Sequence, residues 1–146
     1  MRRPGPRSLL DEEVDSLAMP HPHTPQGPVL VAGGAGYIGS HTVRALEERD
    51  VAVVVLDNLS TGHRASVRAP LAEVDLGDRK GLRAVFAEHR PRAVIHFAAK
   101  CYVGESVEKP GLYYEENVHK TWCLLEEMRA AGVRDIVFSS TCATYG

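Results

Sequence analysis

The feature that most constrains the fold of this chain is a short apolar run that stops at a cluster of glycines. Residues 29–32 are all apolar, and Gly33, Gly36 and Gly39 follow at the spacing G-x-x-G-x-x-G. A short apolar run of this kind is typical of a buried parallel strand. The glycines permit a tight turn, let the backbone approach a pyrophosphate, and let the next helix pack closely on the sheet. The pattern predicts a strand, a turn and a helix that bind a dinucleotide; the alternative is a purely structural glycine turn.

Apolar runs and amphipathic stretches then alternate along the chain. Further strands are predicted over 51–56, 71–74, 93–97 and 135–138, and helices over 37–49, 79–89 and 112–131. Strands that alternate with helices form right-handed crossovers and a parallel sheet. We therefore predict an α/β fold, a Rossmann-like doubly wound parallel sheet of five strands. The residues expected on the buried faces of the first and last helix are Ile38, Thr42, Ala45 and Leu46, and Val118, Leu125 and Met128.

The composition excludes several classes of function. The 146 residues carry 17 Lys and Arg against 19 Asp and Glu, a net charge of -2. This balance produces no general cationic field, so we expect neither nucleic acid nor a membrane surface as a partner. No apolar stretch approaches the length of a transmembrane helix. Cys101, Cys123 and Cys142 have neither metal-ligand spacing nor an even count, which favours reduced thiols, a cytoplasmic location and no bound metal.

The first 28 residues differ from the rest of the chain. Six of the nine prolines fall there, together with three arginines and an acidic cluster at 11–15. Such a segment cannot recover its ordering entropy by burial, so we predict a disordered proline-rich tail over 1–28 and a dinucleotide-binding domain over 29–146. Met19 lies shortly before the first predicted strand, and we consider it an alternative start of translation.

A carboxylate after the second predicted strand indicates which dinucleotide is bound. Asp57 follows Gly39 by eighteen residues. A carboxylate there accepts hydrogen bonds from both hydroxyls of the adenosine ribose, and it repels the 2′-phosphate of NADP. The sequence therefore favours NAD over NADP.

Several longer motifs extend this prediction. They are Gly-Gly-Ala-Gly-Tyr-Ile-Gly-Ser-His at 33–41, Asp-Asn-Leu-Ser at 57–60, Val-Gly-Glu-Ser-Val at 103–107, Lys-Pro at 109–110, Tyr-Tyr at 113–114, Asn-Val at 117–118 and Phe-Ser-Ser-Thr at 138–141. Together they resemble the UDP-glucose 4-epimerase family of extended short-chain dehydrogenase/reductase enzymes. The resemblance covers residues 29–146 and does not extend to the tail.

The resemblance implies an isomerase of galactose metabolism with NAD as tightly bound cofactor, a UDP-sugar as substrate, and a homodimer as a candidate assembly. In that family NAD+ takes a hydride from C4 of a UDP-hexose, and the hydride returns to the other face of the keto sugar. Thr141 would be the catalytic residue that hydrogen-bonds the reacting sugar hydroxyl. The implied cofactor-binding residues are Gly33, Gly36, Tyr37, Ile38, Gly39, Asp57, Asn58, Leu59, Ser60, Thr61, Gly62, Asp75, Leu76, Phe97, Ala98, Ala99, Lys100 and Asn117.

Structural roles compete with some of these assignments. Asn117 has the alternative role of bridging loop backbone, Glu105 that of fixing its own glycine loop, and Thr141 that of satisfying backbone at the end of a strand. Tyr113 has the alternative role of packing at the start of a helix. His96 lies inside a predicted strand, where a core histidine is more common than an acid-base group.

The chain also departs from the family pattern. Lys120 stands where a small glycine is usual, so we expect it either to extend away from the helix or to disturb the contact between helix and sheet. Lys100 is offset from a lysine that often precedes the Val-Gly-Glu-Ser segment. The proton-transfer pair Tyr-x-x-x-Lys is absent from the 146 residues. We therefore expect a truncated chain that is inactive by itself; the alternatives are an epimerase for a UDP-pentose or UDP-uronate, and a non-catalytic NAD-binding pseudoenzyme.

Overall fold

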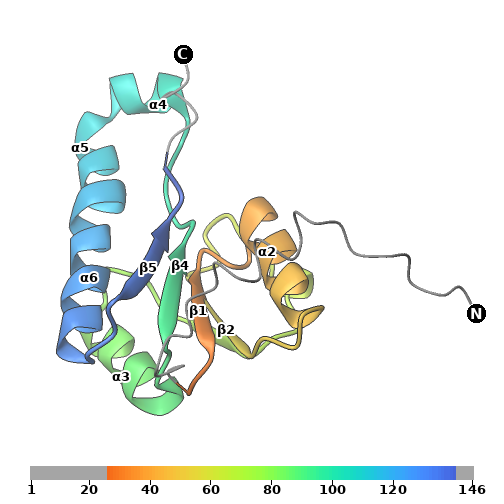
Figure 1. The fold of residues 1–146 in the computed structure, drawn as a ribbon. Coiled ribbons are helices and arrows are strands. Elements are labelled where there is room, and N and C mark those ends of the chain that lie inside the picture. The colour runs from red at the N-terminus through yellow and green to blue at the C-terminus, as the bar shows by residue number, and fades with distance from the viewer. Residues whose placement is uncertain (1–25, 141–146) are drawn as a thin grey trace, which may run out of the picture.

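The computed structural model describes residues 26–140, and five parallel strands form one sheet at the centre (Figure 1). The strands are β1 (Val29–Ala32), β2 (Val53–Asp57), β3 (Leu71–Glu73), β4 (Ala93–His96) and β5 (Asp135–Phe138). Their order across the sheet is β3-β2-β1-β4-β5. The chain moves outward from β1 to β3 on one side, then crosses to β4 and continues to β5. This is the order of a doubly wound, Rossmann-like sheet, which confirms the predicted fold class.

The central strand β1 is in register with both of its neighbours. Ala32 pairs with Leu56 of β2 and with His96 of β4. All residues of β1 and β2 are buried, which explains why both strands are apolar almost throughout. Because the three strands are parallel, the loops that follow them leave the sheet at one edge.

Alternate side chains of the strands build two cores, one on each face of the sheet. Leu30 and Val54 belong to the core that α3 (Arg79–His89) and α6 (Lys120–Ala130) cover. Val31 and Val55 belong to the other core, with Val43 of α2 (Tyr37–Glu47). Figure 1 shows α3 and α6 on one side of the sheet and α2 on the other. The division follows from the geometry of a strand, in which successive side chains point to opposite faces.

The first helix is shorter than predicted and buries a different face. α2 ends at Glu47 rather than at residue 49, and its buried residues are Gly39 and Val43. Ile38, which was expected in the core, is 60% exposed, and the other three residues of the predicted face are half-buried. The reason is the close approach at Gly39, where a Cβ atom would overlap the carbonyl oxygen of Gly33. The helix therefore packs on the sheet by the side that carries this glycine.

The helix predicted over 112–131 is divided into three segments. They are α5 (Pro110–Tyr113), the π-helix η2 (Tyr114–His119) and α6. A π-helical turn holds more residues than an α-helical turn, so it changes the direction in which the following side chains point. Met128 is buried as predicted, but Val118 and Leu125 are 57% and 43% exposed. Leu124 takes the expected place of Leu125 in the core.

The other predicted strands and the middle helix agree closely with the structure. α3 and β5 have the predicted bounds, and β3 and β4 each end one residue earlier than predicted. β2 begins two residues later than predicted and ends one residue later, at Asp57. Two short helices that were not predicted, η1 (Arg64–Ser66, a 3-10 helix) and α4 (Val103–Glu108), lie in the connections that follow β2 and β4.

The buried face of α6 can be tested through stability. Leu124 is fully buried, whereas Leu125 is 43% exposed. We expect Leu124→Ala to lower the free energy of unfolding by about 2–5 kcal/mol, because it leaves a cavity in the core. The matched control Leu125→Ala should lower it by less than about 1 kcal/mol. Urea unfolding followed by circular dichroism measures both values, and a larger loss for Leu125→Ala would contradict this packing.

Candidate functional site

A cavity of about 370 Å³ lies where the carboxyl ends of β1, β2 and β4 meet. Open parallel sheets bind their ligands at this edge. The cofactor-binding residues implied by the sequence that line the cavity are Gly33, Gly36, Tyr37, Ile38, Gly39, Asp57, Asn58, Ser60, Thr61, Asp75, Leu76, Phe97, Ala98, Ala99 and Lys100. Leu59, Gly62 and Asn117 are not part of its wall. The structure therefore gathers most of the selected residues around one cavity.

The wall also contains residues that the sequence analysis did not select as cofactor-binding. They are Leu56, Val74, Cys101, Tyr102, Glu116, Lys120 and Ser139. Four of them, Leu56, Val74, Cys101 and Glu116, are direct neighbours in sequence of selected residues, so widening the selection by one position would have found them. Lys120 is different, because the π-helix η2 decides which side chains of this segment face the cavity.

The glycine turn has no room for side chains. Gly33 has a φ angle of +79°, and a Cβ atom there would lie 2.6 Å from the backbone nitrogen of Ala98. Gly36 occupies the N-cap of α2 and has no side chain to cap the first amide groups of the helix. Free amides and the positive end of the helix dipole attract anions. The turn therefore offers the exposed backbone that a pyrophosphate requires.

Asp57 braces this turn from the end of β2. Its Oδ2 accepts a hydrogen bond of 2.9 Å from the amide of Ala35, and its Oδ1 accepts one of 2.8 Å from the amide of Leu59. The residue is only 8% exposed. A carboxylate has about four lone-pair sites, so each oxygen retains acceptor capacity. Asp57 thus holds the turn in place and still borders the cavity.

Leu59 and Gly62 support Asp57 and do not line the cavity themselves. Leu59 has a left-handed backbone conformation, with φ at +56°, which the hydrogen bond from its amide to Asp57 stabilises. Gly62 lies so close to the carboxylate that a Cβ atom there would be 3.0 Å from Asp57 Oδ1. Both residues therefore shape the turn around the carboxylate.

Asn117 clamps the loop that follows β4. Its Oδ1 accepts a hydrogen bond of 2.8 Å from the amide of Lys100, and its Nδ2 donates one of 2.9 Å to the carbonyl oxygen of Lys100. This is the backbone-bridging role that the sequence analysis left open. Asn117 sits in the π-helix η2, and wide turns of this kind are frequent at functional sites. The clamp fixes the backbone of Lys100, which lines the cavity.

Lys120 lies in the cavity wall and does not extend away from the helix. Its Nζ donates hydrogen bonds of 2.8 Å to Asp75 Oδ2 and 2.8 Å to Glu116 Oε1, and its side chain is 14% exposed. The expectation that this lysine extends away from the helix is therefore wrong, because two carboxylates pair with it where it lies. Burial acts to lower the pKa of Lys120, but the two carboxylates raise it above its usual value. Burial acts to raise the pKa of Asp75, but hydrogen bonds from Lys120, Gly77 and Asn58 lower it.

Tyr113 and Glu105 fix the loop in front of α4. The Tyr113 hydroxyl donates a hydrogen bond of 2.8 Å to the carbonyl oxygen of Tyr102, accepts one of 3.1 Å from its amide, and lies 3.1 Å from Glu105 Oε2. Glu105 also lies 3.9 Å from Lys100 Nζ and 3.5 Å from Lys109 Nζ. Burial, together with the negative charge of Glu105 close to the hydroxyl, raises the pKa of Tyr113. These contacts give both residues a structural role.

Comparison with known proteins assigns this arrangement to a family. Residues 29–146 match the NAD dependent epimerase/dehydratase family. The chain belongs to this family.

Individual relatives in the epimerase/dehydratase family are longer than this chain. A UDP-glucose 4-epimerase of Rhizobium leguminosarum bv. trifolii is 55% identical over 119 residues, which are 81% of this chain and 36% of that protein. UDP-arabinose 4-epimerase 1 of Arabidopsis thaliana is 46% identical over 130 residues, covering 81% of this chain and 31% of the relative. The crystal structure of UDP-glucose 4-epimerase from Brucella ovis in complex with NAD has a TM-score of 0.79 at 50% identity, covering 82% of this chain and 37% of that one. The chain thus spans about a third of the length of these relatives.

His96 behaves as a core residue of this epimerase/dehydratase domain. It is 2% exposed at the end of β4, and its Nε2 lies 2.9 Å from Thr121 Oγ1. Burial lowers the pKa of His96 to about 4, so the ring is neutral at pH 7. Thr141, Cys142 and residues 1–25, including Met19, lie outside the described residues, so what the sequence analysis predicts for them stays a prediction.

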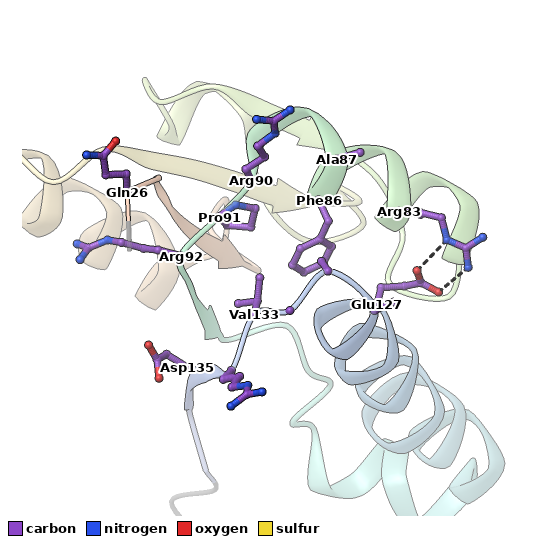
Figure 2. Close-up of a pocket in the computed structure, with 14 residues that line it drawn as sticks. Gln26, Arg83, Phe86, Ala87, Arg90, Pro91, Arg92, Glu127, Val133 and Asp135 are labelled. Atoms are coloured by element: carbon purple, nitrogen blue, oxygen red, sulfur yellow. Dashed lines mark hydrogen bonds and ion pairs between the residues drawn. The ribbon is translucent and has the colours of Figure 1, made fainter. Parts of the chain in front are cut away.

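A second cavity, of about 850 Å³, lies at the amino ends of β4 and β5 (Figure 2). Among the described residues that line it, none is a cofactor-binding residue implied by the sequence, and α3 and α6 both end beside it. The carboxyl ends of helices carry free carbonyl groups that attract cations, which is consistent with the several arginines in this lining. Figure 2 shows Arg83 paired with Glu127, at 3.0 Å, and Arg79 lies 2.9 Å from the same carboxylate. Hydrogen bonds from Arg83 and Arg79 hold the pKa of Glu127 below its usual value, and the cluster straps α3 to α6.

Within residues 26–140, no three His, Cys, Asp or Glu side chains are grouped as a metal site. Over the same range, no helix is both long and apolar enough to cross a bilayer.

Proposed function

We propose that this chain is the NAD-binding part of an epimerase that interconverts UDP-glucose and UDP-galactose. The observation that carries the proposal is the glycine turn, where Gly33 and Gly39 clear the backbone of side chains beside the cavity. Asp57 at the end of β2 supports NAD in particular. The Rhizobium relative, which is named a UDP-glucose 4-epimerase, supports the sugar, and the Brucella ovis structure with NAD supports the cofactor.

The residues of this chain have mainly binding roles in the proposed reaction. NAD supplies, when bound, the acceptor to which hydride passes from C4 of the sugar and from which it returns. The first amides of α2 would hold the pyrophosphate, and Asp57 would hold the adenosine ribose. Asp75 and Leu76 would contact adenine, while the loop 97–100, held by Asn117, would run along the cofactor. Thr141, outside the described residues, is proposed to hydrogen-bond the reacting sugar hydroxyl.

Asp57 predicts selectivity for NAD+ over NADP+. The carboxylate repels a 2′-phosphate, so we expect NAD+ to bind at least roughly tenfold more tightly than NADP+. Asp57→Asn removes the charge and should lower this preference, whereas Glu47→Gln, on the exposed side of α2, should leave it unchanged. Isothermal titration calorimetry with both dinucleotides measures the ratio. Equal binding of NAD+ and NADP+ by the unchanged chain would contradict the assignment.

The absent Tyr-x-x-x-Lys pair predicts that the chain alone does not epimerise UDP-galactose. In such a pair the lysine lowers the pKa of the tyrosine that moves the proton. We expect activity from a chimera that joins residues 29–146 to the remaining carboxyl-terminal part of the Rhizobium relative. Conversion of UDP-galactose to UDP-glucose, followed by chromatography, measures both proteins. Turnover by the chain alone would refute the prediction, and a folded chimera that binds NAD without turnover would favour the non-catalytic alternative.

A UDP-pentose is the second candidate substrate, because the Arabidopsis relative is named a UDP-arabinose 4-epimerase. The lower identity of that relative, 46% against 55% for the Rhizobium protein, leaves the hexose as the preferred substrate. A UDP-uronate has no such support among these relatives.

We further propose that the chain forms a homodimer through the outer face of η2 and α6. Tyr114, Val118, Trp122 and Leu125 are 70%, 57%, 49% and 43% exposed. Tyr114 and Val118 lie in η2, and Trp122 and Leu125, three residues apart in α6, share one face of that helix. Figure 1 shows this helical segment at the outer side of the molecule. A twofold axis brings such an apolar stripe against the same stripe of a second copy, so a second copy of this chain is its proposed occupant.

If the apolar stripe forms the dimer interface, a charge placed in the stripe should halve the mass of the protein in solution. Trp122→Glu introduces such a charge and should convert the dimer to a monomer. Lys80→Glu, at an exposed position on α3, is the control and should leave the dimer intact. Sedimentation velocity measures the mass of each protein, and a monomeric unchanged chain would refute this interface.

We also propose a cytoplasmic location for the chain. Cys101 and Cys123, the two cysteines within residues 26–140, are free thiols, the state that a reducing compartment maintains. Fractionation of the cells that produce the protein tests this location.

A further inference from the structure

A nearly buried ammonium group in the cavity wall has no part in the glycine turn or in the brace at Asp57. Lys120 begins α6, and its side chain is 14% exposed. Its Nζ lies 2.8 Å from Asp75 and 2.8 Å from Glu116, and all three side chains line the cavity. Burying a long charged side chain is costly unless it is paired, so its position here requires these two partners.

Asp75 is the partner whose carboxylate is held most firmly. Besides Lys120, its Oδ2 accepts a hydrogen bond of 2.6 Å from Asn58 Nδ2, and its Oδ1 accepts one of 2.8 Å from the amide of Gly77. Three donors therefore fix a group with about four lone-pair sites. The side chain of Asp75 is still 35% exposed, so the remaining acceptor capacity is available at the cavity.

Lys120 also decides the charge of this part of the wall. Asp75 and Glu116 share its ammonium group, which separates the two carboxylates. Without the ammonium, two carboxylates would face each other across a partly buried gap, and like charges at such a distance favour protonation of one of them. A protonated or displaced Asp75 would lose its fixed acceptor.

We propose that Lys120 is a positioning residue that makes the cofactor site select adenine, by holding Asp75 as an ionised acceptor for the exocyclic amino group of the base. This inference rests on the proposed NAD site and deepens it. Adenine presents an amino group, a donor, at C6, whereas hypoxanthine presents a carbonyl oxygen, an acceptor, at the same place. A fixed carboxylate accepts a hydrogen bond from the amino group of adenine. With hypoxanthine, the carboxylate and the carbonyl oxygen would be two acceptors facing each other without a proton between them, so the site should bind this base more weakly.

The test compares NAD+ with nicotinamide hypoxanthine dinucleotide, which differs from NAD+ at this position of the base. Isothermal titration calorimetry on the full chain gives the ratio of the two dissociation constants. The unchanged chain should bind NAD+ roughly tenfold more tightly than the hypoxanthine analogue. Lys120→Met should bring the ratio close to one, and Lys120→Arg, which keeps the charge, should retain most of the preference. Lys80→Met, on the exposed surface of α3, is the control and should keep the full ratio.

A second pair of variants separates positioning from general stability. Asp75→Asn should lose the preference for adenine as Lys120→Met does, and the double variant should show no further change, because Lys120 acts through Asp75. Circular dichroism checks that each variant is folded. If Lys120→Met does not fold, the other two variants test the inference: the preference for NAD+ should be lost in Asp75→Asn and retained in Lys120→Arg.

The outcomes distinguish this inference from the proposed function. Failure of the unchanged chain to bind either dinucleotide would overturn the NAD site itself. Binding of NAD+ with no preference over the hypoxanthine analogue, or a preference that survives in Lys120→Met or Asp75→Asn, would overturn the role of Lys120 and leave the NAD site standing. Loss of the preference in both single variants, without a further change in the double variant, supports the inference.

Discussion

Close backbone contact at the glycine turn is the constraint on which the rest of this site depends. Because Gly33 lacks a side chain, Ala98 in the loop after β4 can pass directly beside the turn after β1. Gly39 likewise lets α2 begin against the carbonyl oxygen of Gly33. A Cβ atom at either position would overlap backbone, and backbone cannot rotate away as a side chain does. The helix and the loop therefore become two walls of one cavity only because the turn has no side chains.

Hydrogen bonds connect several of the residues around the cavity to one another. Asp57 accepts hydrogen bonds from the amide of Ala35 in the glycine turn and from the amide of Leu59 in the loop after β2. The side-chain amide of Asn117 accepts a hydrogen bond from the backbone amide of Lys100 and donates one to its carbonyl oxygen. Glu105 and Tyr113 secure the same loop further along. These hydrogen bonds are made within the protein itself, so less conformational entropy is lost when a ligand binds against the wall.

Local pattern predicts much of this domain but not all of it. The doubly wound parallel sheet of five strands, the bounds of α3 and β5, and most of the cavity wall follow from apolar periodicity and from motifs that are short and contiguous. The π-helix η2 does not, because an extra residue in a helical turn leaves no mark in composition, and the face predicted to hold Val118 is therefore not the buried one. Leu125 lies beyond η2, in α6, where Leu124 and Met128 occupy the buried face instead. Lys120 was misjudged for another reason: its partner Asp75 lies 45 residues away in the sequence, and only the folded sheet brings the two together.

The wide turn of η2 also bears on which changes of chain length this domain can accept. A π-helical turn behaves as an α-helix with a residue inserted, so the helix continues while the side chains before the insertion are rotated relative to those after it. Removing one residue from 114–119 would therefore leave α6 seated on α3, with Leu124 still in the core. It would, however, shift Glu116 or Asn117 away from the cavity and from the loop it clamps. We therefore expect a deletion in this segment to disturb the cavity wall more than the core between α3 and α6.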